Sequence, residues 1–445
     1  MSTPKTINVQ EFINSHKLSS TQILLLVLCF LIVAIDGFDL ASIGFIAPAI
    51  KAEWGATPAQ LAPLFGSGLI GLMLGALIIG PLADRFGRKA ILIFSVVFFG
   101  AASLLSAFSP NMTVLIVLRF MTGVGLGGAM PSAVTLTSEY CPEGRRSFLV
   151  TLMFCGFTLG SALGGVVASQ IVADYGWRSV LVIGGVLPLL LVPVLWLLLP
   201  ESLRYLVMKG GQDQRIVSTL HRIEPSVDLA NATFTGAEKP HGSPVLQLFE
   251  ADLWRGTLLL WATFFMGLVV IYLLSNWLPT IIHNSGMSLQ TASLITAMFQ
   301  IGGTIGSVSL GRLMDKFNPY HVLAFSYASG GAFVFLIGLS SELPWLMTLA
   351  IFGAGFSGSG SQVGANALAA AYYPTASRAT GVAWANAVGR SGAVLGSMLG
   401  GVMLTMGWSF PTIFALTAIP GFIAGASMFA VGLTRRRAVP VAVAA

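Results

Sequence analysis

The sequence contains few charged residues: Asp, Glu, Lys and Arg make up 9% of its 445 residues. A soluble globular protein carries about 25%. In contrast, 55% of the residues are hydrophobic and the mean hydropathy is +0.84. A soluble fold of this length could not hide so much apolar surface, so the composition predicts that lipid is the solvent for much of the chain.

Residues that build metal, disulfide and nucleotide sites are also sparse. The three cysteines form no CxxC pair and the five histidines show no HxxH spacing, so neither a disulfide nor a metal site is indicated. The chain has no GxxxxGK[ST] loop, no apparent nucleophile–base pair and no basic face of a soluble module. We therefore expect a protein that is not an enzyme, uses no cofactor or metal and binds no nucleic acid.

Long hydrophobic segments dominate what is present. A transmembrane helix needs about 20 mostly apolar residues, and twelve segments qualify. They are residues 23–49, 59–82, 90–108, 114–140, 147–172, 179–199, 257–282, 288–314, 322–339, 343–372, 377–406 and 411–433. Residues 1–20 are polar, so we expect an uncleaved first helix rather than a signal peptide.

The Lys and Arg residues lie almost entirely on one side of these segments. Of the 23, nineteen fall in one set of loops and termini, and only Lys51 and Arg178 fall in the opposite loops. Arg119 and Arg390 lie inside the segments. Because basic residues favour the cytoplasmic side, both termini are predicted to be cytoplasmic.

An internal repeat divides the chain into residues 1–199 and 256–445, with the polar residues 200–255 between them. Residues of the same type recur at an offset of 231: Pro48 and Pro279, Gly71 and Gly302, Gly75 and Gly306, Gly80 and Gly311, Asp84 and Asp315. The repeat predicts an all-α membrane protein with 12 transmembrane helices in two six-helix pseudo-symmetric bundles, joined by a cytoplasmic linker with short surface helices. The substrate site of such a protein lies near mid-membrane between bundles that rock against each other.

Ionisable residues that break the repeat are candidates for chemistry. Asp36 and Asp39 correspond to Gly267 and Val270, and their i, i+3 spacing puts both acids on one helix face. A charge at the bilayer centre costs about 2.5–3.5 kcal/mol on insertion scales, so such residues usually face a cavity and have a function. We favour proton coupling by this pair. Either acid could carry the proton, and we favour Asp39, with Asp36 in close support. The alternatives are a structural ion pair with Arg119 and a helix-capping role.

The turn after the second segment carries the motif G-P-L-A-D-R-F-G-R-K at residues 80–89. Asp84 can cap the next helix and pair with basic residues near Arg145 or Arg146, which would hold the cytoplasmic side shut. The alternative is that the motif only fixes topology and a tight turn. The gating candidates are Asp84, Arg85, Arg88, Glu139, Arg146, Asp315 and Arg378.

Arg390 is the principal candidate for holding an anionic substrate. It follows Asn386 by four residues and offers a planar fork to a carboxylate, although it could instead pair with Asp36 or Asp39. Aromatic residues near span ends are more often packing or interface anchors. The further substrate-binding candidates are Arg119, Asn386, Tyr272, Asn276, Trp384, Gln362, Asn366 and Phe38.

Two segments place glycine at every fourth residue. Gly156, Gly160 and Gly164 form one such series, and residues 392, 396 and 400 form the other. Glycine at this spacing lets helix backbones approach closely, so packing is the predicted role of both.

The motif at residues 80–89 matches a signature of the major facilitator superfamily, and Leu118-Arg-Phe-Met-Thr-Gly123 resembles the fourth-helix motif of the same superfamily. Together with Asp36-Gly-Phe-Asp39, they resemble the aromatic acid:proton symporter family. The resemblance implies a major facilitator fold. It also implies functional importance for the span-1 acids, the loop aspartates and the span-11 arginine region, which here are Asp36, Asp39, Asp84, Asp315, Arg378 and Arg390.

The same resemblance implies a monomeric inner-membrane symporter. It would import protons with aromatic carboxylates such as 4-hydroxybenzoate or protocatechuate by alternating access. Two other functions stay open: a proton-antiport exporter of organic compounds, and a membrane receptor for aromatic acids.

Overall fold

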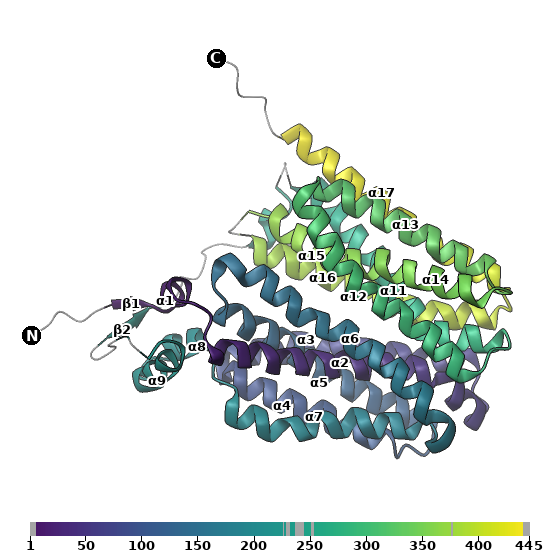
Figure 1. The fold of residues 1–445 in the computed structure, drawn as a ribbon, viewed down its shortest axis with the longest axis horizontal. Helices are drawn as coiled ribbons and strands as arrows, with labels where there is room; N and C mark the ends of the chain where they lie inside the picture. Colours follow the sequence, from purple (N-terminus) through teal and green to yellow (C-terminus); the bar gives the residue numbers. More distant parts are fainter. Residues whose placement is uncertain are drawn as a thin grey trace, which may run out of the picture. The chain divides into compact units, whose positions relative to one another are not determined.

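Nearly all of the residues described by the computed structural model are helical (Figure 1). The described residues are 6–225, 227, 232–235, 244–250, 253–374 and 377–438, so parts of the predicted linker lie outside them. Within these ranges, eleven helices are long and apolar enough to cross a membrane. They are α2 (Ser20–Trp54), α3 (Pro58–Phe86), α4 (Arg88–Ser106), α5 (Met112–Tyr140), α6 (Glu143–Tyr175), α7 (Arg178–Leu198), α11 (Trp254–Asn284), α12 (Leu289–Lys316), α13 (Pro319–Leu339), α16 (Arg378–Thr405) and α17 (Phe410–Ala438).

The predicted span 343–372 is one helical path whose pitch changes in the middle. It comprises α14 (Pro344–Ala354), the π-helical turn η1 (Gly355–Ser359) and α15 (Gly360–Tyr372). A Cβ added at Gly355 would collide with the backbone of Phe299 on α12, so only glycine permits this approach. Counted with the eleven long helices, this path agrees with the predicted twelve. Single π turns inside helices occur frequently at functional sites.

The helices pack as two compact units. Unit 1 comprises Met1–Gly37, Ile70–Gly160 and Leu181–Pro240, and unit 2 comprises Phe38–Leu69, Ser161–Val180 and His241–Ala445. The boundary crosses α2, α3, α6 and α7, and it also falls within the predicted linker, between Pro240 and His241. The predicted division into residues 1–199, 200–255 and 256–445 stays a prediction.

Unit 2 shows why segments of the first half group with the second half. The ring of Phe65 on α3 meets Trp277 on α11 edge to face, with centroids 4.8 Å apart. Lys51 Nζ at the end of α2 donates to Asn284 Oδ1 at the end of α11, at 3.3 Å. The two sequence halves are therefore packed together within unit 2, at the end that the distribution of basic residues predicts to be outer.

The same end of unit 2 contains a closely packed charge pair. Arg178 Nη1 donates to both carboxylate oxygens of Glu53, at 2.7 and 2.9 Å, and Trp177 Nε1 donates to the same carboxylate at 2.7 Å. The guanidinium also lies over the Trp177 ring, 4.3 Å from its centroid. These contacts fix the end of α2 to the turn between α6 and α7.

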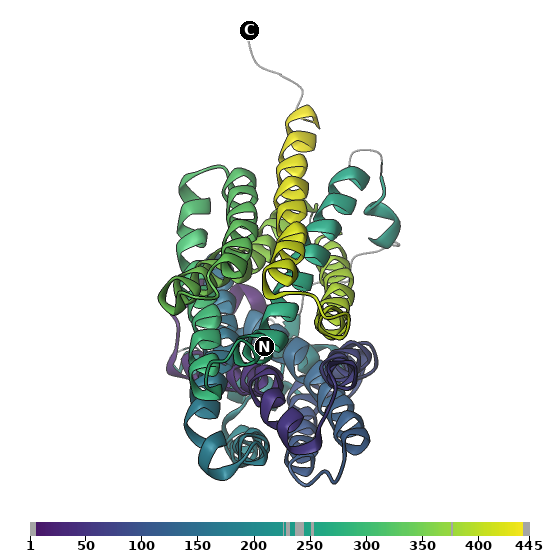
Figure 2. The same ribbon diagram turned by 90° about the vertical axis from the view of Figure 1, so that its right-hand side faces the viewer.

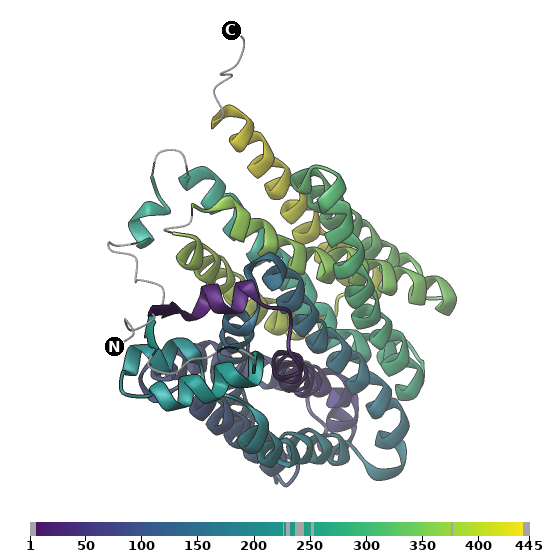
Figure 3. The same ribbon diagram turned by 60° about the vertical axis from the view of Figure 1, so that its left-hand side comes forward.

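Short elements gather at one end of unit 1 (Figures 1 and 3). They are β1 (Thr6–Asn8), α1 (Val9–Ser15), α8 (Leu203–Lys209), α9 (Asp213–Ile223) and β2 (Thr233–Thr235); α10 (Pro244–Gln247) belongs to unit 2. Strands β1 and β2 pair in parallel, with Thr6 opposite Thr233. Helix α9 buries Ile216 and Leu220 on one face. The short helices expected in residues 200–255 are present.

The two glycine series lie where helices touch, as predicted. Gly156 and Gly160 face the α2 backbone at Phe30 and Ala34, and a Cβ at Gly160 would collide with the Ala34 carbonyl. In unit 2, Gly392 and Gly396 face the α11 backbone, and Gly400 faces the Trp277 ring of the same helix. Helix α17, drawn in yellow, packs along α13 (Figure 2). Close backbone approach through glycine is a common device for joining helices in lipid.

We expect Gly160→Val to destabilise the protein by about 1–3 kcal/mol, because the added methyl groups have no space beside Ala34. Thermal unfolding in detergent should show a lower Tm. Gly144→Val on the same helix is the matched control, because a Cβ there meets nothing within 4 Å. An unchanged Tm for Gly160→Val would contradict the packing role of this glycine.

Candidate functional site

Two carboxyl groups lie one turn apart inside α2. Asp36 is 1% exposed and Asp39 is fully buried. Gly37 between them lies against the backbone of Phe157, and Phe38 lies beside Gly164, so α6 packs closely along this part of α2. Their depth in an apolar helix agrees with the sequence prediction of costly intramembrane charge, which is usually kept for function.

Polar side chains of unit 2 form a connected chain across three helices. Asn386 Nδ2 on α16 donates to Asn366 Oδ1 on α15, at 2.8 Å. Asn366 Nδ2 donates to the Gln362 carbonyl at 3.0 Å, and Tyr327 OH on α13 donates to Gln362 Oε1 at 3.0 Å. Arg390 is half-buried one turn beyond Asn386. The structure thus brings together three predicted substrate residues, and Arg390 adjoins them along α16.

The Gln362 side chain is oriented with its amide nitrogen available as a donor. Its oxygen accepts from Tyr327, while Nε2 is buried and makes no hydrogen bond to the residues that the structure describes. A Cβ at Gly267 would lie 2.8 Å from Gln362 Oε1 and 3.1 Å from the Tyr327 ring. The repeat partner of Asp36 is therefore a glycine that makes room for this pair. A buried amide donor needs a partner, which a ligand oxygen can supply.

A charge cluster lies in unit 1 where α3, α4 and α5 meet. Arg88 Nη2 is 3.1 Å from Asp84 Oδ1, and Arg88 Nε is 3.3 Å from Glu139 Oε1. Ser202 Oγ donates to the other Glu139 oxygen at 2.5 Å. Three of the predicted gating residues are thus in contact.

The prediction that Asp84 caps the following helix is wrong. The N-cap of α4 is Gly87, at φ 99°, which has no side chain to cap the helix. Asp84 belongs to the last turn of α3, with a side chain 67% exposed, and it pairs with Arg88. Arg146 pairs with Glu143, at 3.9 Å, rather than with Asp84. The positive φ at Gly87 favours glycine, and the chain turns there without a cap from Asp84.

Glu201 is a residue of this cluster that the sequence reasoning did not select. Its Oε1 accepts from the backbone N–H of Lys89 at 3.0 Å and of Ser202 at 2.8 Å. Its backbone carbonyl accepts from Tyr140 OH at 2.6 Å. A carboxylate at the N-terminal end of α4 also complements the helix dipole. The sequence feature that could have indicated Glu201 is its position in Pro200-Glu201-Ser202, directly after the sixth predicted span.

Residues 29–292 and 260–445 match the model of the Major Facilitator Superfamily. The chain belongs to this superfamily. Its predicted fold, a multi-pass membrane transporter of 12 helices, is therefore confirmed, as is the expectation that it is not an enzyme.

Curated members of the superfamily resemble this chain over nearly its whole length. The gallate transporter of Pseudomonas putida is 44% identical over 440 residues, covering 98% of each chain. The 4-hydroxybenzoate transporter PcaK of the same organism is 46% identical over 433 residues, covering 96% of each chain. Among solved structures, the xylose transporter XylE from E. coli superposes with a TM-score of 0.72 at 18% identity, covering 95% of this chain and 98% of that chain. This last likeness shows the fold alone.

The other substrate-binding candidates of unit 2 lie apart from its polar chain or have partners of their own. Asn276 is buried and donates to Ser397 Oγ at 2.9 Å, which joins α11 to α16. Trp384 is exposed and stacks on Trp261, with centroids 5.8 Å apart. Tyr272 is half-buried on α11.

The remaining charged candidates occupy separate elements. Arg119 is buried in α5 of unit 1. Arg85 is exposed with its guanidinium over Phe86, and both Asp315 and Arg378 are exposed in unit 2. Tyr327, which the sequence reasoning missed, was visible as a phenol in the middle of the span 322–339.

Proposed function

We propose that this protein is a proton symporter that imports hydroxylated benzoates, such as 4-hydroxybenzoate, protocatechuate or gallate. Its location would be the inner membrane, with both termini cytoplasmic, and it would act as a monomer. The observation that carries the proposal is the 44–46% identity, over at least 96% of the chain, to transporters named for gallate and 4-hydroxybenzoate. The buried acids of α2 supply groups that can bind and release a proton.

The proposal gives each part of the substrate a partner in unit 2. Arg390 binds the carboxylate through its planar fork, and the buried Gln362 amide donates to a ring hydroxyl. Tyr327 holds that amide in place from the opposite side. An aromatic acid thereby meets a cation at one end and a neutral hydrogen-bond donor at the other. Because only a hydroxylated ring can accept from that donor, the site would bind hydroxylated benzoates more tightly than unsubstituted ones.

Proton uptake by the acids of α2 would couple proton movement to substrate transport. In the proposed cycle, Asp39 takes up a proton from the outer side, with Asp36 in support, and the anion binds Arg390. The outer contacts of unit 2, such as Lys51 with Asn284, close behind the substrate. Moving more than one proton with each monoanion also uses the membrane potential, worth about 2.3 kcal/mol per charge per 100 mV.

Competition for uptake across a panel of acids tests the proposed substrate class. Proteoliposomes would take up labelled 4-hydroxybenzoate in the presence of protocatechuate, gallate, benzoate or aliphatic muconate. The hydroxylated benzoates should compete best, benzoate less and muconate least. Best competition by muconate would contradict a site built for aromatic rings. Accumulation driven only by a proton gradient of the opposite sign would indicate an exporter instead.

Gln362→Leu should reduce discrimination between 4-hydroxybenzoate and benzoate by about fivefold. A hydrogen bond between neutral groups contributes roughly 0.5–1.5 kcal/mol, and leucine removes the buried donor while keeping the volume. Binding constants for the two acids would be measured by thermal shift on wild type and variant. Asn276→Leu serves as a control, because its amide binds Ser397. An equal loss of affinity for both acids in Gln362→Leu would argue against a contact with the hydroxyl.

A further inference from the structure

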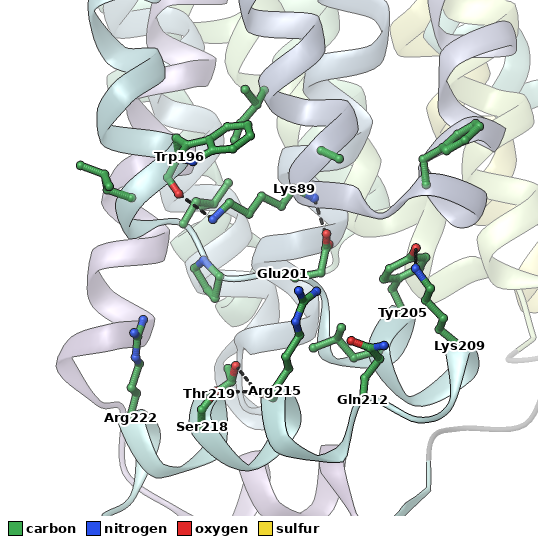
Figure 4. Close-up of a pocket in the computed structure, with 17 residues that line it drawn as sticks. Lys89, Trp196, Glu201, Tyr205, Lys209, Gln212, Arg215, Ser218, Thr219 and Arg222 are labelled. Carbon is green, nitrogen blue, oxygen red and sulfur yellow. Dashed lines mark hydrogen bonds between the residues drawn. The ribbon is translucent and has the colours of Figure 1, made fainter.

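A cavity of about 600 Å³ lies in unit 1 between α4, the end of α7, α8 and α9 (Figure 4). The hydrogen-bonded polar residues of unit 2 do not line this cavity, and neither do Asp36 and Asp39. Its walls carry four cationic side chains and one carboxylate. The cations are Lys89, Lys209, Arg215 and Arg222, and the carboxylate is Glu201.

The positive charge of this cavity is only partly offset, because four cations line it with a single carboxylate. Glu201 is already committed, through one of its oxygens, to the backbone N–H groups at the start of α4. Lys89 Nζ donates to the Trp196 carbonyl at 2.8 Å, and Lys209 Nζ donates to Tyr205 OH at 3.3 Å. None of the four cations forms a salt bridge within the part of the chain that the structure describes. The wall therefore favours an anion.

One side of the cavity is apolar and faces outward. Trp196 and Leu197, in the last turn of α7, are 66% and 75% exposed, and Phe86 at the end of α3 is also exposed. Exposed tryptophan at the end of a membrane-spanning helix is typical of the lipid interface. In Figure 4 the Trp196 ring lies next to Lys89, while Arg215 and Arg222 rise from α9 on the opposite side. The cavity thus combines a lipid-facing edge with a cationic floor.

We propose that this cavity binds the phosphate headgroup of an acidic phospholipid from the cytoplasmic leaflet, with the acyl chains running along α7. Basic pockets beside transmembrane helices on the cytoplasmic side bind such headgroups, and arginine offers a two-pronged contact to phosphate. The exposed Trp196 and Leu197 select a lipid over a soluble anion, because they offer surface to acyl chains. Bound lipid would join α9 of the linker to the start of α4, next to the charge cluster.

Binding of short-chain phosphatidylglycerol to the full-length protein in neutral detergent tests the proposal. The comparison arms are inorganic phosphate and short-chain phosphatidylcholine, and the test variant carries Arg215→Gln with Arg222→Gln. Each basic residue contributes about fivefold in affinity at an anionic surface, so the double variant should bind phosphatidylglycerol roughly 25-fold more weakly. Arg145→Gln with Arg255→Gln makes the same change in net charge outside the cavity and should retain wild-type affinity. Native mass spectrometry of each protein should show retained phosphatidylglycerol on wild type and on the control.

Three results would overturn the proposal: equal affinity of the double variant and wild type, equal loss in the control variant, or equal affinity of wild type for phosphatidylcholine. Tight binding of inorganic phosphate with no preference for the lipid would assign the cavity to a soluble anion instead. All of these readouts are equilibrium binding of lipid or phosphate, so they do not depend on the proposed transport activity.

Discussion

Asp39→Asn is expected to abolish proton-driven accumulation of 4-hydroxybenzoate while leaving exchange of labelled for unlabelled substrate intact. Asparagine keeps the size of the fully buried aspartate but cannot bind and release a proton. With 100 mV imposed and one net charge moved per cycle, wild type can reach about 50-fold accumulation. The variant should not raise the internal concentration above the external one, because the potential opposes entry of an anion that brings no protons. Uptake and counterflow in proteoliposomes measure the two activities separately.

Two further variants make this experiment decisive. Asp36→Asn should weaken accumulation less than Asp39→Asn does, since Asp36 has the supporting role. Asp174→Asn, at an exposed position near the end of α6, makes the same chemical change and should behave as wild type. Full accumulation by both Asp36→Asn and Asp39→Asn would remove the two acids from the coupling mechanism.

Arg390→Gln should weaken substrate binding by roughly 30-fold or more. Losing one partner of a desolvated charge pair costs about 2–5 kcal/mol, because the remaining carboxylate is left without a countercharge. Arg390→Lys should recover only part of the affinity, since an ammonium group cannot make the two parallel hydrogen bonds of a guanidinium. Thermal shift or equilibrium binding with 4-hydroxybenzoate would provide the constants.

Arg255→Gln is the matched control for this variant, because Arg255 is an exposed arginine of unit 2 that lies over the Trp254 ring. It should leave the binding constant unchanged. If Arg390→Gln retained wild-type affinity, the carboxylate would have to bind elsewhere, and the proposed orientation of the substrate would fail.

The membrane-spanning segments were predictable because each needs only a sufficient run of apolar residues. The span 343–372 was found in this way, but its π turn at Gly355–Ser359 was not, since that turn depends on the approach of α12. The glycine series were also predictable, because a four-residue spacing by itself places glycine on one helix face.

The candidate site was harder to predict from the sequence, because it depends on contacts between residues that are far apart along the chain. Tyr327 and Gln362 meet through the space left by Gly267, and the sequence shows no more than a polar residue in each of two spans. The capping role assigned to Asp84 failed for a similar reason. A carboxylate near a helix start suggests a cap, but Glu201, 112 residues along from Lys89, occupies that place.

Recording proton movement during substrate uptake tests proton-coupled transport most directly. Proteoliposomes would contain a pH-sensitive dye, and 4-hydroxybenzoate would be added outside at equal starting pH. Liposomes carrying Asp39→Asn would serve as the control for passive entry of the acid. Wild type should acidify the interior faster and further than the Asp39→Asn liposomes, in step with uptake of the label. Uptake by wild type with no more acidification than in the Asp39→Asn liposomes would contradict a proton symporter.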